Sequence, residues 1–149
     1  MTNKFRHLQL ETLDKHLADV QVPERPSGGW VRAIRTALGM NARQLAERIG
    51  VSQQALSQLE SKEADDSVTI KTLRRAAEAM GCKVVYAVVP GEGSLQDIIE
   101  EQALKKAKEL VEAVDHTMKL EAQGVGGVED KTRQVADEMA ENLNSSLWD

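Results

Sequence analysis

The 149-residue sequence predicts a mainly α-helical protein that contains one short strand. Three observations lead to this fold class. Apolar residues recur three or four positions apart over several segments, which is the spacing of one face of a helix. Aromatic residues make up only 3% of the chain and hydrophobic residues 41%, so we expect aliphatic cores. Gly and Pro residues separate the periodic segments, as they do at turns.

The first expected helix covers residues 4–20. Its apolar face contains Leu10, Leu13 and Leu17 at helical spacing. A segment rich in Pro, Ser and Gly follows at residues 23–29 and ends the helix. Residues 1–29 are therefore expected to be an N-terminal helix and a linker.

Four short helices with recognisable capping and turn residues come next. Their expected ranges are 30–38, 42–49, 53 to about 61, and 70–80. The second has Asn41 as its N-cap, and Gln44 lies three residues further on, in a capping-box arrangement. Ser52 and Thr69 are expected to cap the two helices after it. Gly50 can adopt the left-handed backbone conformation that the intervening turn needs.

Residues 82–89, CKVVYAVV, have a different character from the rest of the chain. They are β-branched and apolar on both faces and are followed by Pro90, which predicts one buried strand. A lone strand leaves its peptide groups unpaired. We therefore expect a homodimer in which Cys82–Val89 pairs antiparallel with the same segment of a second copy. A weaker alternative pairs the strand with residues 20–22 of the same chain.

Two further helices are expected, at residues 94–123 and 128–147, with a Gly-rich break between them. The long first helix carries an apolar stripe along its length. Together with the strand, these helices form an expected third region, residues 82–149, for dimerisation or for binding a partner.

Charge is distributed unevenly along the chain. The net charge of −5 divides into zero for residues 1–29, +2 for residues 30–81 and −7 for residues 82–149. The middle region is therefore locally basic, which suits an anionic partner.

Several classes of protein are excluded by what the sequence lacks. A single cysteine, Cys82, rules out an internal disulfide and fits a reducing compartment. No apolar run is long enough to span a membrane, and the first residues lack a signal-peptide core, so we expect a cytoplasmic protein. The three His residues are scattered without metal-ligand spacing, and no nucleophile–base pair can be recognised. We expect no enzyme activity, no catalytic residue, no metal and no cofactor.

The segment from Asn41 to Glu60 is the most informative part of the sequence. Its two helices are joined only by residues 49–52, too few for an antiparallel pair, so they must cross steeply as in a helix-turn-helix. The residues expected in their shared core are Leu45, Ile49, Leu56 and Leu59. The residues expected on the outer face of the second helix are Gln53, Gln54, Ser57 and Gln58.

This segment, with Leu38 to Met40 before it, closely resembles the DNA-binding domain of lambda-type phage repressors and the wider XRE family. The resemblance implies a five-helix domain over residues 30–81 whose second motif helix enters the major groove. It also implies base contacts from Gln53, Gln54 and Gln58, because a glutamine amide suits the N6/N7 edge of adenine.

The same resemblance implies contacts of other kinds. Asn41, with Arg43 and Lys62, is expected to contact phosphates, and Arg35 and Glu60 are expected to form a structural ion pair. The acidic residues after Lys62 depart from the pattern of several relatives. They would weaken DNA binding if their loop lay near the duplex.

A wider similarity covers nearly the whole chain. The run Arg25–Trp30, the segment Cys82–Pro90 and the run Met118–Gln123 look like the bacterial family called mobile mystery protein A. Members of that family are encoded beside a Fic-domain protein. The expected function is therefore a sequence-specific transcriptional regulator that binds a pseudo-palindromic operator and represses the operon it shares with that protein. The alternative is an antitoxin-like partner of the Fic-domain protein, acting through residues 94–149.

Overall fold

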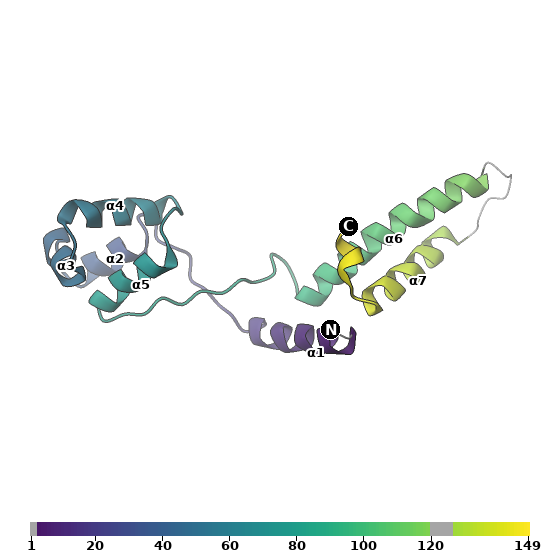
Figure 1. Cartoon of the computed structure of the whole chain (residues 1–149), viewed down its shortest axis with the longest axis horizontal. Coiled ribbons are helices and arrows are strands. Elements are labelled where there is room, and N and C mark those ends of the chain that lie inside the picture. The colour runs from purple at the N-terminus through teal and green to yellow at the C-terminus, as the bar shows by residue number, and fades with distance from the viewer. Residues whose placement is uncertain (1–2, 120–126) are drawn as a thin grey trace. The chain divides into compact units, whose positions relative to one another are not determined.

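A computed structural model describes the backbone of residues 3–119 and 127–149, and the side chains of the same ranges apart from residues 115–119. It is mainly helical (Figure 1). The elements are α1 (Asn3–Leu17), α2 (Trp30–Ala37), α3 (Ala42–Ile49), α4 (Gln53–Ala64), α5 (Ile70–Ala79), α6 (Leu95–Lys119), α7 (Val128–Glu141) and a 3₁₀ helix, η1 (Ser145–Trp148).

The chain folds as two compact units. The central unit is Val22–Ala87, and the terminal unit combines Met1–Gln21 with Val88–Asp149. Each unit has its own cluster of buried apolar side chains. The three domain ranges expected from the sequence remain a prediction.

Helices α2 to α5 surround the core of the central unit. Leu45 and Leu56 are fully buried there, and Leu59 is also buried, while Ile49 packs against them in a partly buried position. The rest of this buried cluster is Val31, Ala46, Ala76 and Met80. The core expected between α3 and α4 is therefore present, and small residues such as Ala46 allow the helices to approach closely.

The expected caps of these helices are confirmed. Asn41 accepts a hydrogen bond from the backbone N–H of Gln44, whose side chain bonds back to the N–H of Asn41, which completes the capping box. Ser52 and Thr69 cap α4 and α5 through their hydroxyl oxygens. Gly50 ends α3 with φ of 86°, in the left-handed region expected for the turn.

In the terminal unit, α6 and α7 run side by side in opposite directions (Figure 1). Their contact is made by small and aliphatic side chains, with Ala103 and Ala107 fully buried. Side chains of helix α1 form hydrogen bonds with the start of α6 and with the turn that follows α7. The carboxylate of Asp14 accepts hydrogen bonds from the N–H groups of Leu95 and Gln96 at 2.7 and 3.1 Å, and Arg6 donates to the carbonyl of Leu143 at 2.8 Å.

These contacts place charges where helix ends favour them. An anion lies at the N-terminus of α6, and a cation lies just beyond the C-terminus of α7. The N-terminal helix is therefore packed on the C-terminal helices, although the sequence between them folds as a separate unit.

The predicted strand is not seen. Residues 82–89 have no regular secondary structure, and Val85 and Val88 are 80% and 85% exposed rather than buried. A strand needs a neighbouring strand for its hydrogen bonds, and none exists within the described ranges. The alternative pairing with residues 20–22 is absent as well.

The expected helix at residues 128–147 was too long. Helix α7 ends at Glu141, and the chain turns before η1, where Asn144 accepts a hydrogen bond from the N–H of Ser146. This turn buries Leu147 beside α6 and α7. The cluster of Asn and Ser at residues 142–146 was the sequence signal for the break. The expected helix at residues 94–123 corresponds to α6, and residues 120–123 lie outside the described residues.

Candidate nucleic-acid interface

Helices α3 and α4 are held in a helix-turn-helix arrangement. The N–H groups of Gly50 and Val51 both donate to the carbonyl of Ala46, at 2.9 and 3.0 Å, which closes the turn tightly. Ala46 is itself buried, so nothing bulky separates the two helices. The orientation of α4 is therefore set by a short turn and a shared core.

One face of α4 is buried and the opposite face is open. Leu56, Leu59 and Glu63 are buried, at the i, i+3, i+7 spacing of one helical face. The exposed side chains opposite them are Gln53, Gln54, Ser57, Gln58, Ser61 and Lys62, which we call the recognition face. Its only charged member is Lys62, so no carboxylate belongs to it.

The amides on the recognition face are available for binding. Among the described residues, no hydrogen bond involves the side chain of Gln53, Gln54 or Gln58. A shallow depression runs along the helix and is lined by Gln54, Ser57, Gln58, Ser61 and Lys62. The three amides expected to contact bases therefore lie on one exposed surface.

The residues expected to contact phosphates are also exposed, but their side chains are engaged to different extents. The Oδ1 atom of Asn41 is used by the capping box, which leaves its Nδ2 group as a free donor. Arg43 donates to Glu47 at 2.9 Å, and both side chains are more than 60% exposed, so this pair can open at little cost. Lys62 has no partner in the described structure.

Arg35 and Glu60 lie together between α2 and α4. The Nε atom of Arg35 is 2.7 Å from Glu60 Oε1, and its Nη2 is 3.3 Å from Oε2, while Nη1 donates to the carbonyl of Met40. The side chains are only 13% and 12% exposed. This two-point pairing fixes α4 against α2 and keeps the Glu60 carboxylate off the recognition face.

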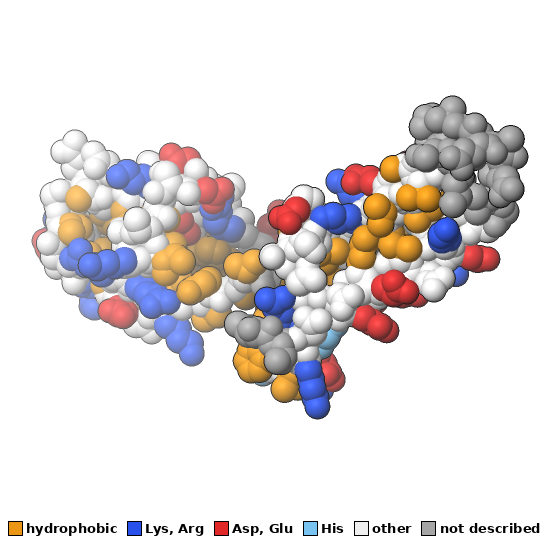
Figure 2. Space-filling view, turned by 45° about the vertical axis from the view of Figure 1, so that its right-hand side comes forward, with side chains coloured by type: hydrophobic (Ala, Val, Ile, Leu, Met, Phe, Trp, Pro, Cys, Tyr) orange, Lys and Arg blue, Asp and Glu red, His pale blue; other side chains and the backbone are white. Residues whose placement is uncertain are grey.

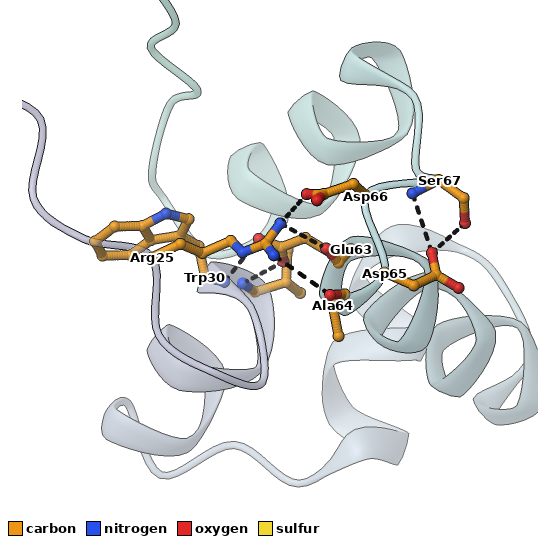
Figure 3. A network of polar contacts seen from close by, with 8 residues as sticks. Arg25, Trp30, Glu63, Ala64, Asp65, Asp66 and Ser67 are labelled. Carbon is orange, nitrogen blue, oxygen red and sulfur yellow. Dashed lines mark hydrogen bonds and ion pairs between the residues drawn. The ribbon is translucent and has the colours of Figure 1, made fainter. Parts of the chain in front are cut away.

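The acidic residues that follow Lys62 are also engaged (Figure 3). Glu63 points into the protein and accepts hydrogen bonds from the backbone of Trp30 and Val31. Asp66 pairs with Arg25, and Asp65 accepts from the N–H of Ser67. The acidic residues that were expected to weaken DNA binding therefore have partners within the protein.

Sequence reasoning missed Arg25 and Glu63. Their partners lie more than 30 positions away, so no local pattern joins them. One signal was present, because the apolar spacing of Leu56 and Leu59 continues to Glu63 on the same helical face. A carboxylate at a core position predicts a buried partner.

The positive charge of the protein is concentrated in the central unit. Residues 22–87 carry ten basic and seven acidic side chains, a net charge of +3, whereas the terminal unit carries −8. Among the described residues, seven exposed basic side chains of the central unit have no hydrogen bond or ion pair: Arg32, Arg48, Lys62, Lys71, Arg74, Arg75 and Lys83. Of these, Arg74 lies over the ring of Tyr86, 6.0 Å from its centroid. Basic side chains are spread over this unit in Figure 2. Such a surface attracts a polyanion.

The described residues show no sign of a metal site or of a membrane span. They contain no group of His, Cys, Asp and Glu side chains that could hold a metal ion. No helix among them combines the length and the apolar character that crossing a bilayer requires.

Comparison with known proteins supports the helix-turn-helix interpretation. No curated protein and no solved structure matches the chain, and nothing found supports the wider resemblance to mobile mystery protein A. Residues 31–86, which include nearly all of α2 and the whole of α3 to α5, match the family model HTH_3, described as Helix-turn-helix. Within the central unit, residues 31–86 are therefore similar to helix-turn-helix domains.

Proposed function

We propose that this protein is a sequence-specific transcriptional regulator that contacts base edges through α4. The observation that carries the proposal is the recognition face, an exposed and acid-free surface with three unengaged amides in a helix-turn-helix unit. A glutamine amide donates and accepts at once, which suits the N6/N7 pair of adenine in the major groove. The helix caps and the Arg35–Glu60 pair hold this surface in one orientation.

Phosphate contacts are proposed at the edges of the recognition face. Lys62 has a free ammonium group, and Asn41 offers its Nδ2 donor at the N-terminus of α3, where a helix favours an anion. Arg43 would exchange Glu47 for a phosphate, which costs little because their ion pair is exposed.

We further propose that two copies associate through Cys82–Val89. In the described structure, no backbone group from Lys83 to Gly91 makes a hydrogen bond, and the exposed side chains of this segment include Val85, Tyr86, Val88 and Val89. Antiparallel pairing of two such segments would satisfy the peptide groups and cover the apolar side chains. A two-fold dimer would present two copies of α4 to half-sites about 34 Å apart.

Repression of the operon that encodes the protein is the proposed biological outcome. A dimer bound to a pseudo-palindromic operator would block polymerase sterically. This part of the proposal is supported only by the resemblance of residues 38–60 to the DNA-binding domain of lambda-type phage repressors. Footprinting on the DNA upstream of the protein's own gene tests it, and protection of a symmetric site is the expected result.

Replacement of two amides tests the contact with bases. The double variant Gln53→Ala/Gln54→Ala should lose about 1–3 kcal/mol of discrimination for each base contact removed. The measurement is the ratio of dissociation constants for the footprinted duplex and for a random duplex. Gln134→Ala, an exposed glutamine on α7, is the matched control and should leave the ratio unchanged. Full discrimination by the double variant would refute the proposed role of α4.

As a second candidate function, we propose that the terminal unit docks to a Fic-domain protein. Its support is the acidic terminal unit, where Leu104, Leu110 and Val114 remain exposed on α6. Apolar side chains gather along this part of the molecule in Figure 2. Co-purification that is lost on Leu104→Glu/Leu110→Glu, but kept by the glutamine double variant, would establish docking as a separate activity.

A further inference from the structure

The N-terminus of α2 is capped by a residue from α4. Gly29, the N-cap residue, has no side chain that could accept a hydrogen bond. The carboxylate of Glu63 takes this role, with Oε2 2.7 Å from the N–H of Trp30 and Oε1 2.9 Å from the N–H of Val31. Glu63 is only 3% exposed, so its negative charge is satisfied by backbone donors at the positive end of a helix.

The C-terminus of α4 is capped in the complementary way. The guanidinium of Arg25 donates to the carbonyl oxygens of Glu63 and Ala64, at 2.9 and 3.3 Å, and pairs with the carboxylate of Asp66 (Figure 3). A cation therefore lies against the last carbonyl groups of α4, where the helix end favours positive charge. Arg25 belongs to the segment that precedes α2, so this segment is attached to α4.

The close approach of Glu63 depends on the absence of a side chain at Gly29. A Cβ atom at this position would lie 2.8 Å from Cδ and from Oε1 of Glu63. Gly29 also has φ of 88°, which side-chain-bearing residues rarely adopt. The backbone here is shaped to admit the carboxylate.

We infer that Arg25 and Glu63 are positioning residues for DNA recognition. Glu63 holds α4 at the N-terminus of α2, and Glu60, about one turn earlier on α4, holds it at Arg35 in the last turn of α2. Two carboxylates therefore attach α4 to both ends of α2, and Arg25 secures the second attachment. Removal of the Arg25–Glu63 network would let α4 rotate and displace its amides from the base edges. This inference rests on the proposed function.

Three other roles for Arg25 make different predictions. A direct phosphate contact would lower the dependence of affinity on salt concentration when Arg25 is removed. If Arg25 served only to neutralise the charge of Asp66, Asp66→Ala should raise the affinity for DNA. A contribution to stability alone would lower the melting temperature and leave sequence discrimination intact.

The experiment compares Arg25→Ala, Glu63→Gln, Asp66→Ala and Arg25→Ala/Asp66→Ala in the full chain. Its probes are a duplex selected by the wild-type protein from a random pool and a random duplex of the same length. Dissociation constants are measured at several salt concentrations, at a temperature where circular dichroism shows every variant to be folded. Glu24→Ala, an exposed neighbour without a partner in the described structure, is the matched control.

The expected result is a loss of discrimination of about fivefold or more for Arg25→Ala and Glu63→Gln, the lower end of one bidentate base contact. The salt slope should stay unchanged, and the double variant should not recover what Arg25→Ala loses. Intact discrimination, a slope reduced by about one, or recovery in the double variant would overturn the inference. If Glu63→Gln does not fold, Arg25→Ala decides the result.

Amide hydrogen exchange separates this inference from the proposed function. Exchange at the N–H groups of Trp30 and Val31 should accelerate in Glu63→Gln and Arg25→Ala without any DNA present. If the wild-type protein selects no sequence from the pool, the proposed function fails, and the exchange rates still report whether the network holds α2 to α4. Unchanged exchange in both variants would overturn the network itself.

Discussion

For single residues, the direction in which a charged side chain points decides what it does. On α4, Glu60 and Glu63 point inward to partners on or beside α2, while Lys62 between them is exposed. A helix with acidic residues on both sides of a basic one can therefore present an acid-free surface, because residues one position apart face different directions. The charge of a segment counted along the sequence does not reveal this.

The Arg35–Glu60 pair should be important for stability. Arg35→Ala would leave the Glu60 carboxylate mostly buried without its partner, and we expect a loss of about 3–5 kcal/mol in the free energy of unfolding. Urea denaturation followed by circular dichroism measures this loss. Arg43→Ala is the matched control, because it breaks an exposed pair and should cost less than about 1 kcal/mol. Equal losses in the two variants would show that burial of the Arg35–Glu60 pair has no energetic weight.

For whole elements, local chemistry explains why α2 to α5 were predicted well. Asn41, Ser52 and Thr69 each satisfy backbone donors within three residues, so the start of each helix is encoded by its own neighbourhood. The predicted end of α4 lies about three residues before the observed one. Neither Glu63 nor Ala64 extends the apolar pattern of the helix, and the contact that holds this end, from Arg25, comes from a residue that is distant in sequence. Likewise, the outward orientation of the three amides follows from helical periodicity alone.

The contribution of the N-cap of α4 to stability can be tested by replacing Ser52. Ser52→Ala removes the acceptor for the N–H of Ala55 and should destabilise the protein by about 1 kcal/mol. Ser57→Ala is the control, since Ser57 lies inside α4, is exposed, and makes no side-chain hydrogen bond in the described structure. Alanine also favours a helix interior, so the control should be neutral or slightly stabilising. Thermal denaturation of the two variants decides whether the cap contributes as expected.

For the molecule as a whole, the long-range contacts were beyond prediction. The capping of α6 by Asp14 joins residues 81 positions apart, and the bond from Arg6 to Leu143 joins residues 137 apart. No periodicity in the sequence indicates which helix a surface carboxylate will reach. The strand predicted at residues 82–89 is wrong for a different reason. The composition of this segment favours a strand, but a strand also requires a partner strand, and the residues that the structure describes contain none.

The exposed apolar segment therefore leads to a prediction about the assembly. Val85→Asp/Val88→Asp places two charges where antiparallel pairing would bring apolar side chains together, so the dimer should dissociate and operator affinity should fall. Light scattering over a range of concentrations, together with DNA binding, measures both effects. Val22→Asp is the control, because Val22 is also exposed but lies outside the segment. A wild-type protein that stays monomeric at micromolar concentration would refute pairing through Cys82–Val89. A dimer that survives the double substitution but not Val22→Asp would shift the interface toward residues 20–22.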